Sequence, residues 1–144
     1  MPNTLGSKTD NIFLKGPDGH NIFMEWEVGT AVHIAQPVKF NENGNIEPAA
    51  GTDSDKAVIG YSIMNKKAGE LCTVVTKYRT IVYGQATEAI TEGDKLKIAS
   101  PVYDETTNRI KYAKLSEDDD ENLCLGIALT SASASGDEIA IGLF

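Results

Sequence analysis

The sequence predicts a mostly β protein: a small antiparallel barrel or sandwich that is built from two related halves and carries an N-terminal hairpin arm. Three observations predict this fold. Apolar and polar residues alternate with period two in many short runs bounded by Gly, Pro, Asn or Asp, which is typical of half-buried strands. Helical periodicity is scarce, and one part of the chain matches another.

The size and charge of the chain limit its class and its partners. Its 144 residues suffice for one compact domain. It carries 13 Lys and Arg against 21 Asp and Glu, a net charge of -8 at pH 7. A surface this acidic gains no affinity for phosphates by counterion release, so we expect neither nucleic acid nor a membrane as a partner. The N-terminus lacks the basic start and apolar core of a signal peptide, so we expect synthesis in a cytoplasm.

Residues 1–28 are predicted to form the hairpin arm. Two apolar runs, 11–14 and 21–24, flank Gly16-Pro17-Asp18-Gly19, whose Pro and Gly suit a tight turn. The hairpin either packs on the core of its own domain or adds to a neighbouring protein as an arm, and the sequence leaves both open. The interface candidates are its large apolar side chains: Ile12, Phe13, Leu14, Ile22, Phe23 and Trp26.

The strand signals continue along the chain. Met24, Trp26 and Val28 alternate with Glu25 and Glu27, so the apolar set shares one face. Further strands are expected around 32–34, 96–98 and 139–143. At most a turn or two of helix is expected, and the candidate segments are 65–69, 85–91 and 131–136.

An internal repeat predicts the two halves of a single β domain, residues 29–144. Residues 29–38 match 93–102 at an offset of 64, with coincident Gly, Pro and apolar positions. Residues 57–63 match 123–129 at an offset of 66, and Gly69-Glu70 then matches Gly136-Asp137. The repeats are placed at 29–84 and 93–144. Two such units can close their exposed edges on each other, which favours a barrel or a sandwich.

The residues predict no enzyme. The chain has two imidazoles, His20 and His33, and it lacks a nucleophile elbow, a zinc-protease helix motif and a phosphate-binding loop. We therefore expect no catalytic residue and no cofactor. Cys72 and Cys124 give no disulfide framework and are expected to be reduced core thiols.

The sharpest charge feature is the acidic run at 116–122. Oxygen ligands attract calcium, but the spacing lacks the alternating ligands and central Gly of a calcium loop. We predict a solvated loop and no metal site, and leave open whether residues 117–121 bind an ion.

An ordered series of segments resembles the capsid cement proteins, or decoration proteins, of tailed phages. The resemblance runs from about Gly29 to Phe144 and rests on 58–62, 67–74, 89–96, 107–110 and 125–129, followed by Gly136-Asp137 and a terminal strand. It implies a protein that binds the outside of an icosahedral head, contacts the major capsid protein and stabilises the head. It also implies self-association, commonly as a homotrimer, and a place on the capsid exterior after synthesis in the host cytoplasm.

A second function class stays open. The chain would then be a carbohydrate- or host-binding β module displayed on the virion, as a fibre component. Such a site favours exposed aromatic rings with polar neighbours. The candidates are Tyr78, Tyr83, Tyr103 and Tyr112, which are also spaced as ordinary sheet residues.

Overall fold

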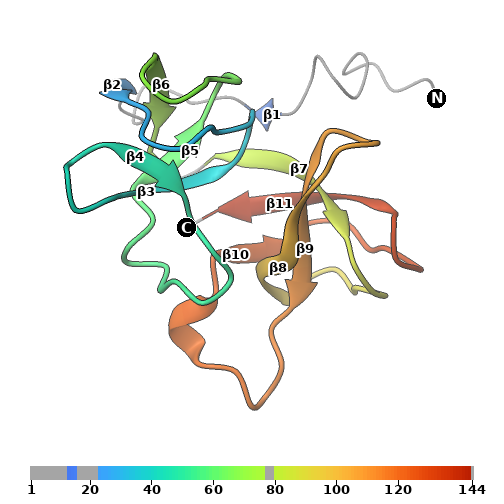
Figure 1. Ribbon diagram of the computed structural model, residues 1–144. Coiled ribbons are helices and arrows are strands. Elements are labelled where there is room, and N and C mark those ends of the chain that lie inside the picture. Colours follow the sequence, from blue (N-terminus) through green and yellow to red (C-terminus); the bar gives the residue numbers. More distant parts are fainter. Residues whose placement is uncertain (1–12, 16–22, 77–79, 144) are drawn as a thin grey trace.

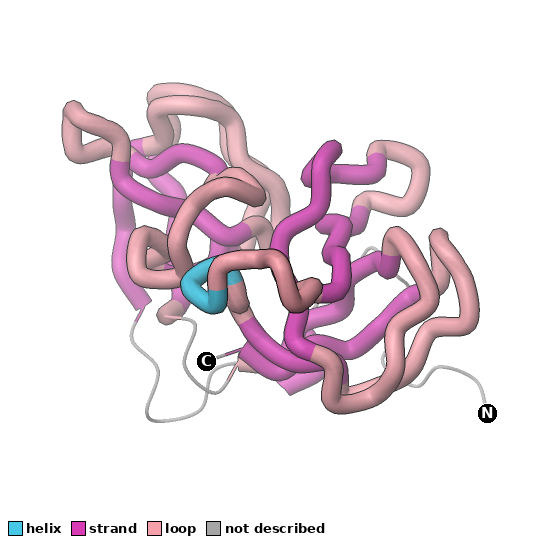
Figure 2. Tube along the Cα trace, turned by 90° about the horizontal axis from the view of Figure 1, so that it is seen from below, coloured by secondary structure: helices cyan, strands magenta, loops and turns pink. Residues whose placement is uncertain are grey.

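A computed structural model describes residues 13–15, 23–76 and 80–143. The fold is all-β, as predicted, with one short 3-10 helix (Figures 1 and 2). The elements are β1 (Phe13–Lys15), β2 (Phe23–Glu27), β3 (Pro37–Phe40), β4 (Ile46–Pro48), β5 (Gly60–Ser62), β6 (Leu71–Val75), β7 (Ile81–Ala86), β8 (Lys95–Asp104), β9 (Arg109–Lys114), η1 (Glu121–Leu123), β10 (Gly126–Ala128) and β11 (Glu138–Leu143).

The strands form two sheets. The first is antiparallel, in the order β2-β6-β5-β3-β4. The second has the order β1-β7-β11-β10-β8-β9, and β7 also pairs in parallel with β9. Strands β7 to β11 therefore close into a five-stranded barrel, with β1 attached to β7. In the first sheet β2 and β4 are the edge strands. One parallel bridge, from Val28 just after β2 to Ile46 at the start of β4, joins them.

The two halves are related, as predicted, because the strand order β2-β6-β5-β3-β4 is repeated as β7-β11-β10-β8-β9. We call strands β2 to β6 the first half and strands β7 to β11 the second half. Paired residues fix the equivalence: Val38 lies opposite Gly60, and Leu96 lies opposite Gly126. Positions 23–40 thus correspond to 81–98 at an offset of 58, positions 46–66 to 112–132 at 66, and positions 69–75 to 136–142 at 67.

The predicted offset of 64 between Gly29 and Gly93 is wrong, while the matches of 57–63 with 123–129 and of Gly69 with Gly136 are confirmed. The change of offset from 58 to 66 arises because the β8–β9 hairpin is longer than the β3–β4 hairpin. The residue equivalent to Gly93 is Ala35. Both have positive φ, 94° and 64°, and their amides donate to the carbonyls of Ala128 and Ser62.

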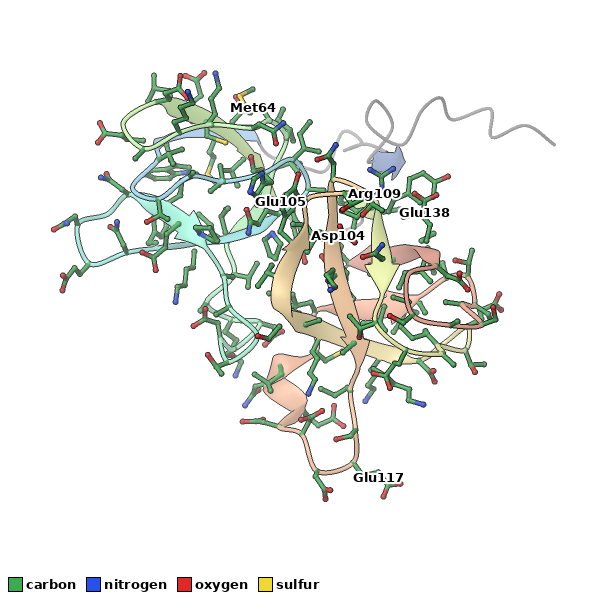
Figure 3. The ribbon with its side chains drawn as sticks, turned by 45° about the vertical axis from the view of Figure 1, so that its right-hand side comes forward. Met64, Asp104, Glu105, Arg109, Glu117 and Glu138 are labelled. Atoms are coloured by element: carbon green, nitrogen blue, oxygen red, sulfur yellow. The ribbon has the colours of Figure 1, made fainter. Side chains whose placement is uncertain are left out.

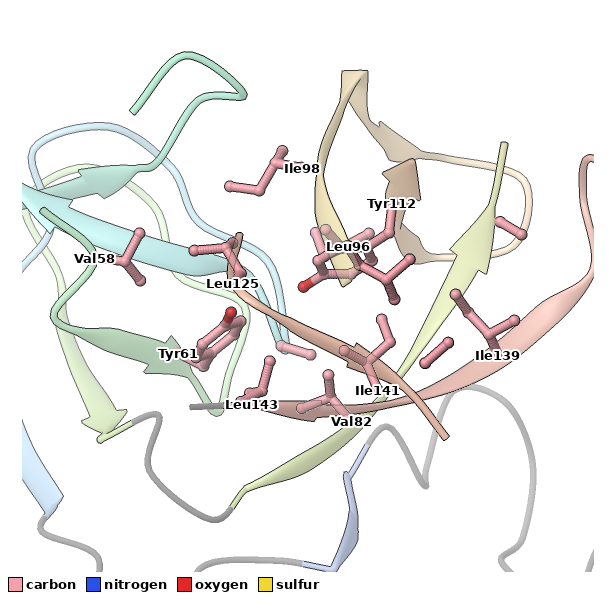
Figure 4. Packing of buried hydrophobic residues seen from close by; sticks show 14 of the residues in the cluster. Val58, Tyr61, Val82, Leu96, Ile98, Tyr112, Leu125, Ile139, Ile141 and Leu143 are labelled. Carbon is pink, nitrogen blue, oxygen red and sulfur yellow. The ribbon is translucent and has the colours of Figure 1, made fainter. Parts of the chain in front are cut away.

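The buried side chains form one large cluster and one small cluster. The small cluster lies inside the first half and contains Val28, Val32, Val38, Ile46, Cys72 and Val74. The equivalent positions in the barrel are Ala86, Ile90, Leu96, Tyr112, Ile139 and Ile141, and all belong to the large cluster (Figure 4). The large cluster also takes in residues of the first half, such as Tyr61 and Val75, so one core joins the halves.

The N-terminal strands correct one expectation. β1 pairs with β7 and β2 pairs with β6, so the described parts of the two apolar runs lie in different sheets and do not pair with each other as a hairpin. Residues 16–22, which would hold the turn, lie outside the described residues. The division into an arm, 1–28, and a domain, 29–144, stays a prediction, but β2 pairs over its full length with the first half.

The predicted helical segments are not helical, whereas the prediction for the two cysteines is confirmed. The segments 65–69 and 131–136 each hold one isolated bridge residue, Lys66 or Ala132, followed by a turn. Residues 85 and 86 end β7, while the 3-10 helix lies at Glu121–Leu123. Asp120 caps that helix by accepting from the Asn122 amide. Cys72 and Cys124 are free and buried, as predicted. Among the described residues, no helix is long and apolar enough to span a membrane.

Candidate functional site

The structure describes four of the six predicted interface residues, and they lie in two different sheets. Ile12 and Ile22 lie outside the described residues. Phe13 and Leu14 belong to β1, which runs along the barrel, whereas Phe23 and Trp26 belong to β2 in the first half. The structure therefore does not join these four into one strand pair. Their contact with a partner stays a prediction.

Trp26 is the one candidate whose side chain the structure describes. It is half-buried and packs on the small cluster, with its ring centroid 4.7 Å from that of Phe40 in an edge-on arrangement. Phe40 is 40% exposed. Sequence reasoning missed Phe40, although its place two residues after the buried Val38 puts both side chains on the same face of β3.

The junction between the halves carries a stacked ring pair. His33 of the first half lies flat on Tyr103 in the long β8–β9 hairpin, with centroids 3.7 Å apart and planes 5° apart. Burial lowers the pKa of His33, against a smaller opposing effect of Glu105. The adjacent Ile34 amide donates to the Asn65 side chain. The extra length of this hairpin thus supplies a contact that fastens the two halves together.

A buried ion pair lies on the barrel wall. The Arg109 side chain on β9 is 2% exposed and approaches Glu138 of β11 at 3.1 Å (Figure 3). Its guanidinium also lies 6.0 Å from the Tyr83 ring centroid on β7. The pair joins β9 to β11 across β7, which lies between these strands. A charge buried as deeply as that of Arg109 is strongly disfavoured without its partner.

The acidic run at 116–122 is partly neutralised by neighbouring groups. Lys97 donates to Asp119 at 2.8 Å, and the Ser116 amide donates to the same carboxylate. The bond from Lys97 is the main cause that lowers the pKa of Asp119 to about 2. Glu117 stands at the far end of this loop (Figure 3). In the described part of the chain, no group of three or more His, Cys, Asp or Glu residues could hold a metal ion.

Three of the four tyrosine candidates for a glycan site are described, and each is buried or packed against another side chain. Tyr112 is wholly buried, Tyr103 is stacked on His33, and Tyr83 is half-buried beside Arg109. Tyr78 lies outside the described residues. The three described rings therefore do not form an exposed sugar-binding platform.

Among the side chains that the structure describes, three large apolar ones are exposed: Phe40, Leu71 and Leu129, at 40%, 59% and 36%. Leu71 precedes the buried Cys72, so strand alternation turns it outward.

The fold defines an all-β protein of two related halves. The chain is similar in structure to the head fiber gp8.5 N base of bacteriophage phi29, known from a crystal structure. The TM-score is 0.58 at 15% sequence identity, over 86% of this chain and 94% of that one. At this identity the likeness shows a shared fold. No family model and no curated protein matches the sequence.

Proposed function

We propose that this chain is a structural protein of a phage virion, held on the outside of the head as the base of a head fibre. The observation that carries the proposal is the likeness to the phi29 head fiber base, which extends over nearly all of both chains. Tyr112 is buried and Tyr103 is stacked on His33, so neither ring is free to bind a sugar, which argues against a glycan site on this part of the fibre. The proposed partners are the major capsid protein and further copies of the chain, in a homotrimer.

The second candidate is a cement protein that stabilises the head. The ordered sequence segments that resemble decoration proteins favour it, and both candidates share attachment to the capsid exterior. Multivalent attachment would give avidity from modest contacts per copy. In neither candidate does the chain need a catalytic residue or a cofactor.

Binding to emptied, expanded heads tests the shared part of the proposal. Heads that lack the protein are incubated with the purified chain and separated on a gradient, and a glycan panel is probed in parallel. We expect saturable binding to heads and none to glycans. Glycan binding without head binding would contradict the proposal.

The strand bounds define two deletions that test whether the predicted N-terminal arm, residues 1–28, binds the capsid. Deletion of residues 1–12 keeps β1, whereas deletion of 1–22 removes β1 and keeps β2 in its sheet. If the arm binds the capsid, at least one deletion weakens head binding while the unfolding temperature stays normal. Unchanged head binding by both folded variants would assign the contact to the domain itself.

Heat resistance of the heads separates the two candidates. A cement protein should raise the temperature at which heads lose their integrity, whereas a fibre base should bind without raising it. Full occupancy, measured on the same gradient fractions, is the control.

A further inference from the structure

The contact between the two halves uses a defined face of the first half. On β5 and β6, Ser62 and Cys72 point inward, where their side chains lie 3.0 Å apart and Cys72 belongs to the small cluster. The alternate residues Tyr61, Ile63 and Val75 point outward and pack into the large cluster with the barrel. We call these outward residues the docking face of the first half.

The barrel receives this face with a second set of side chains. Leu125 and Leu143 lie beside Tyr61 in the shared cluster, and Ile98 belongs to the same cluster (Figure 4). Beside this apolar contact, the Asp55 amide donates to the Asn122 carbonyl at 2.6 Å. These residues form the receiving face of the second half.

Each half also has the face that its partner uses, because the two folds are equivalent. The positions of the second half that match the docking face are Ile127, Leu129 and Gly142. Leu129 is 36% exposed, and Ile127 and Gly142 are partly exposed. The barrel thus carries a second docking face that no described part of the other half covers.

The first half carries the matching receiving face. Phe40 and Ile59 are equivalent to Ile98 and Leu125. Phe40 is 40% exposed, whereas Ile98 at the equivalent position is 4% exposed. Opposite charges lie at the edge of the two uncovered faces. Glu121 occupies the position equivalent to Asp55, and Lys56 occupies the position equivalent to Asn122, so these two residues match the pair that meets within one chain.

We propose that copies of this chain associate head to tail, with the docking face at Ile127 and Leu129 of one copy on the receiving face at Phe40 and Ile59 of the next. The contact repeats between chains the packing that already joins the halves within one chain, and it brings Glu121 towards Lys56. Contacts of this heterologous kind close into a ring or extend into a filament. A closed ring of three copies agrees with the homotrimer proposed above.

Two variants, each with one of the two faces disabled, test this arrangement. Leu129→Glu disables the docking face, and Phe40→Glu disables the receiving face. Both side chains are exposed, so both variants should fold, which circular dichroism and thermal unfolding verify. Sedimentation velocity should show wild-type oligomers and a dissociation constant at least about tenfold higher for each variant alone. Leu71→Glu, at a leucine that is 59% exposed outside both faces, should leave the oligomers unchanged.

The size of the species formed when the two variants are mixed gives the decisive result. Each retains one intact face, so a one-to-one mixture should form dimers and nothing larger. A symmetric contact, in which the same patch meets itself, cannot give this result. A monomeric wild type, or a mixture that stays monomeric, overturns the proposal. Because the measurement uses no phage heads, its failure would leave the proposed attachment to the head unaffected.

Discussion

The imidazole of His33 lies 3.7 Å from the ring of Tyr103, with the two planes 5° apart. His33 belongs to the first half and Tyr103 to the extended hairpin of the second, so this stack joins two elements that the internal repeat alone would leave apart. The hairpin β8–β9 is the main departure of the second half from the first.

Replacing Tyr103 with Ala should lower the free energy of unfolding by about 1–2 kcal/mol, because the ring stack and its partly buried area are lost. Tyr103→Phe is the matched control. It keeps the ring and loses only the exposed hydrogen bond from the hydroxyl to Asn108, so its effect should stay near about 0.5 kcal/mol or below. Urea unfolding measures both. Equal losses in the two variants would show that the stack contributes nothing.

The packing of the barrel predicts a coupling between Gly84 and Tyr112. A Cβ at Gly84 would lie 2.7 Å from atoms of Tyr112 and Ile141, so Gly84→Ala should cost about 1–3 kcal/mol. In the first half the equivalent pair is Trp26 and Ile46, with the large ring on the other strand. Tyr112→Ile should therefore relieve part of the loss, with a coupling of about 1 kcal/mol in a double-mutant cycle. Strictly additive effects would contradict the equivalence.

The ion pair of Arg109 and Glu138 should be strongly coupled. Arg109→Met leaves the Glu138 carboxylate, 22% exposed, without its partner, and should cost about 2–3 kcal/mol. In the Glu138→Gln background the same substitution should cost clearly less, because no charge is stranded. Chemical denaturation of the four proteins gives the cycle. The same cost in both backgrounds would mean that the side chain acts through packing alone.

Asp119 predicts a pH dependence. Its folded pKa lies near 2, below the ordinary value of 3.8, because Lys97 and the Ser116 amide bind the carboxylate. Its contribution to stability is thus present above about pH 4 and is lost as the pH falls from 4 towards 2. Asp119→Asn should be less stable than wild type at pH 6, and the difference should shrink between pH 4 and pH 2. A difference that is constant over this range would contradict the assignment.

Much of the fold follows from local patterns that the sequence displays directly. Trp26 and Val28 lie on the inner side of the first sheet and Glu25 and Glu27 on the outer side, as alternation predicts. The repeat is visible in residues 57–63 because Gly60 and Gly126 meet the same steric demand. A Cβ at either glycine would lie 2.2 Å from the carbonyl oxygen of the neighbouring strand.

Other features depend on contacts that no local pattern reports. The sequence match pairs Gly93 with Gly29, although the residue that shares the positive φ of Gly93 is Ala35, a residue type that gives no turn signal. The pairing of β1 with β7 joins segments far apart in the chain, whereas the turn signal at 16–19 favours a local hairpin. The exposed Phe40 has a buried equivalent, Ile98, so its exposure arises from how the halves meet.

We have proposed that this chain is a structural protein on the outside of a phage head. The most direct test is a cryo-electron microscopy reconstruction of emptied, expanded heads after incubation with the purified chain, compared with heads alone. We expect added density on the outer surface at defined lattice positions, into which the closed barrel and the related first half both fit. Reconstructions without added density, from heads incubated at saturating protein concentration, would contradict it.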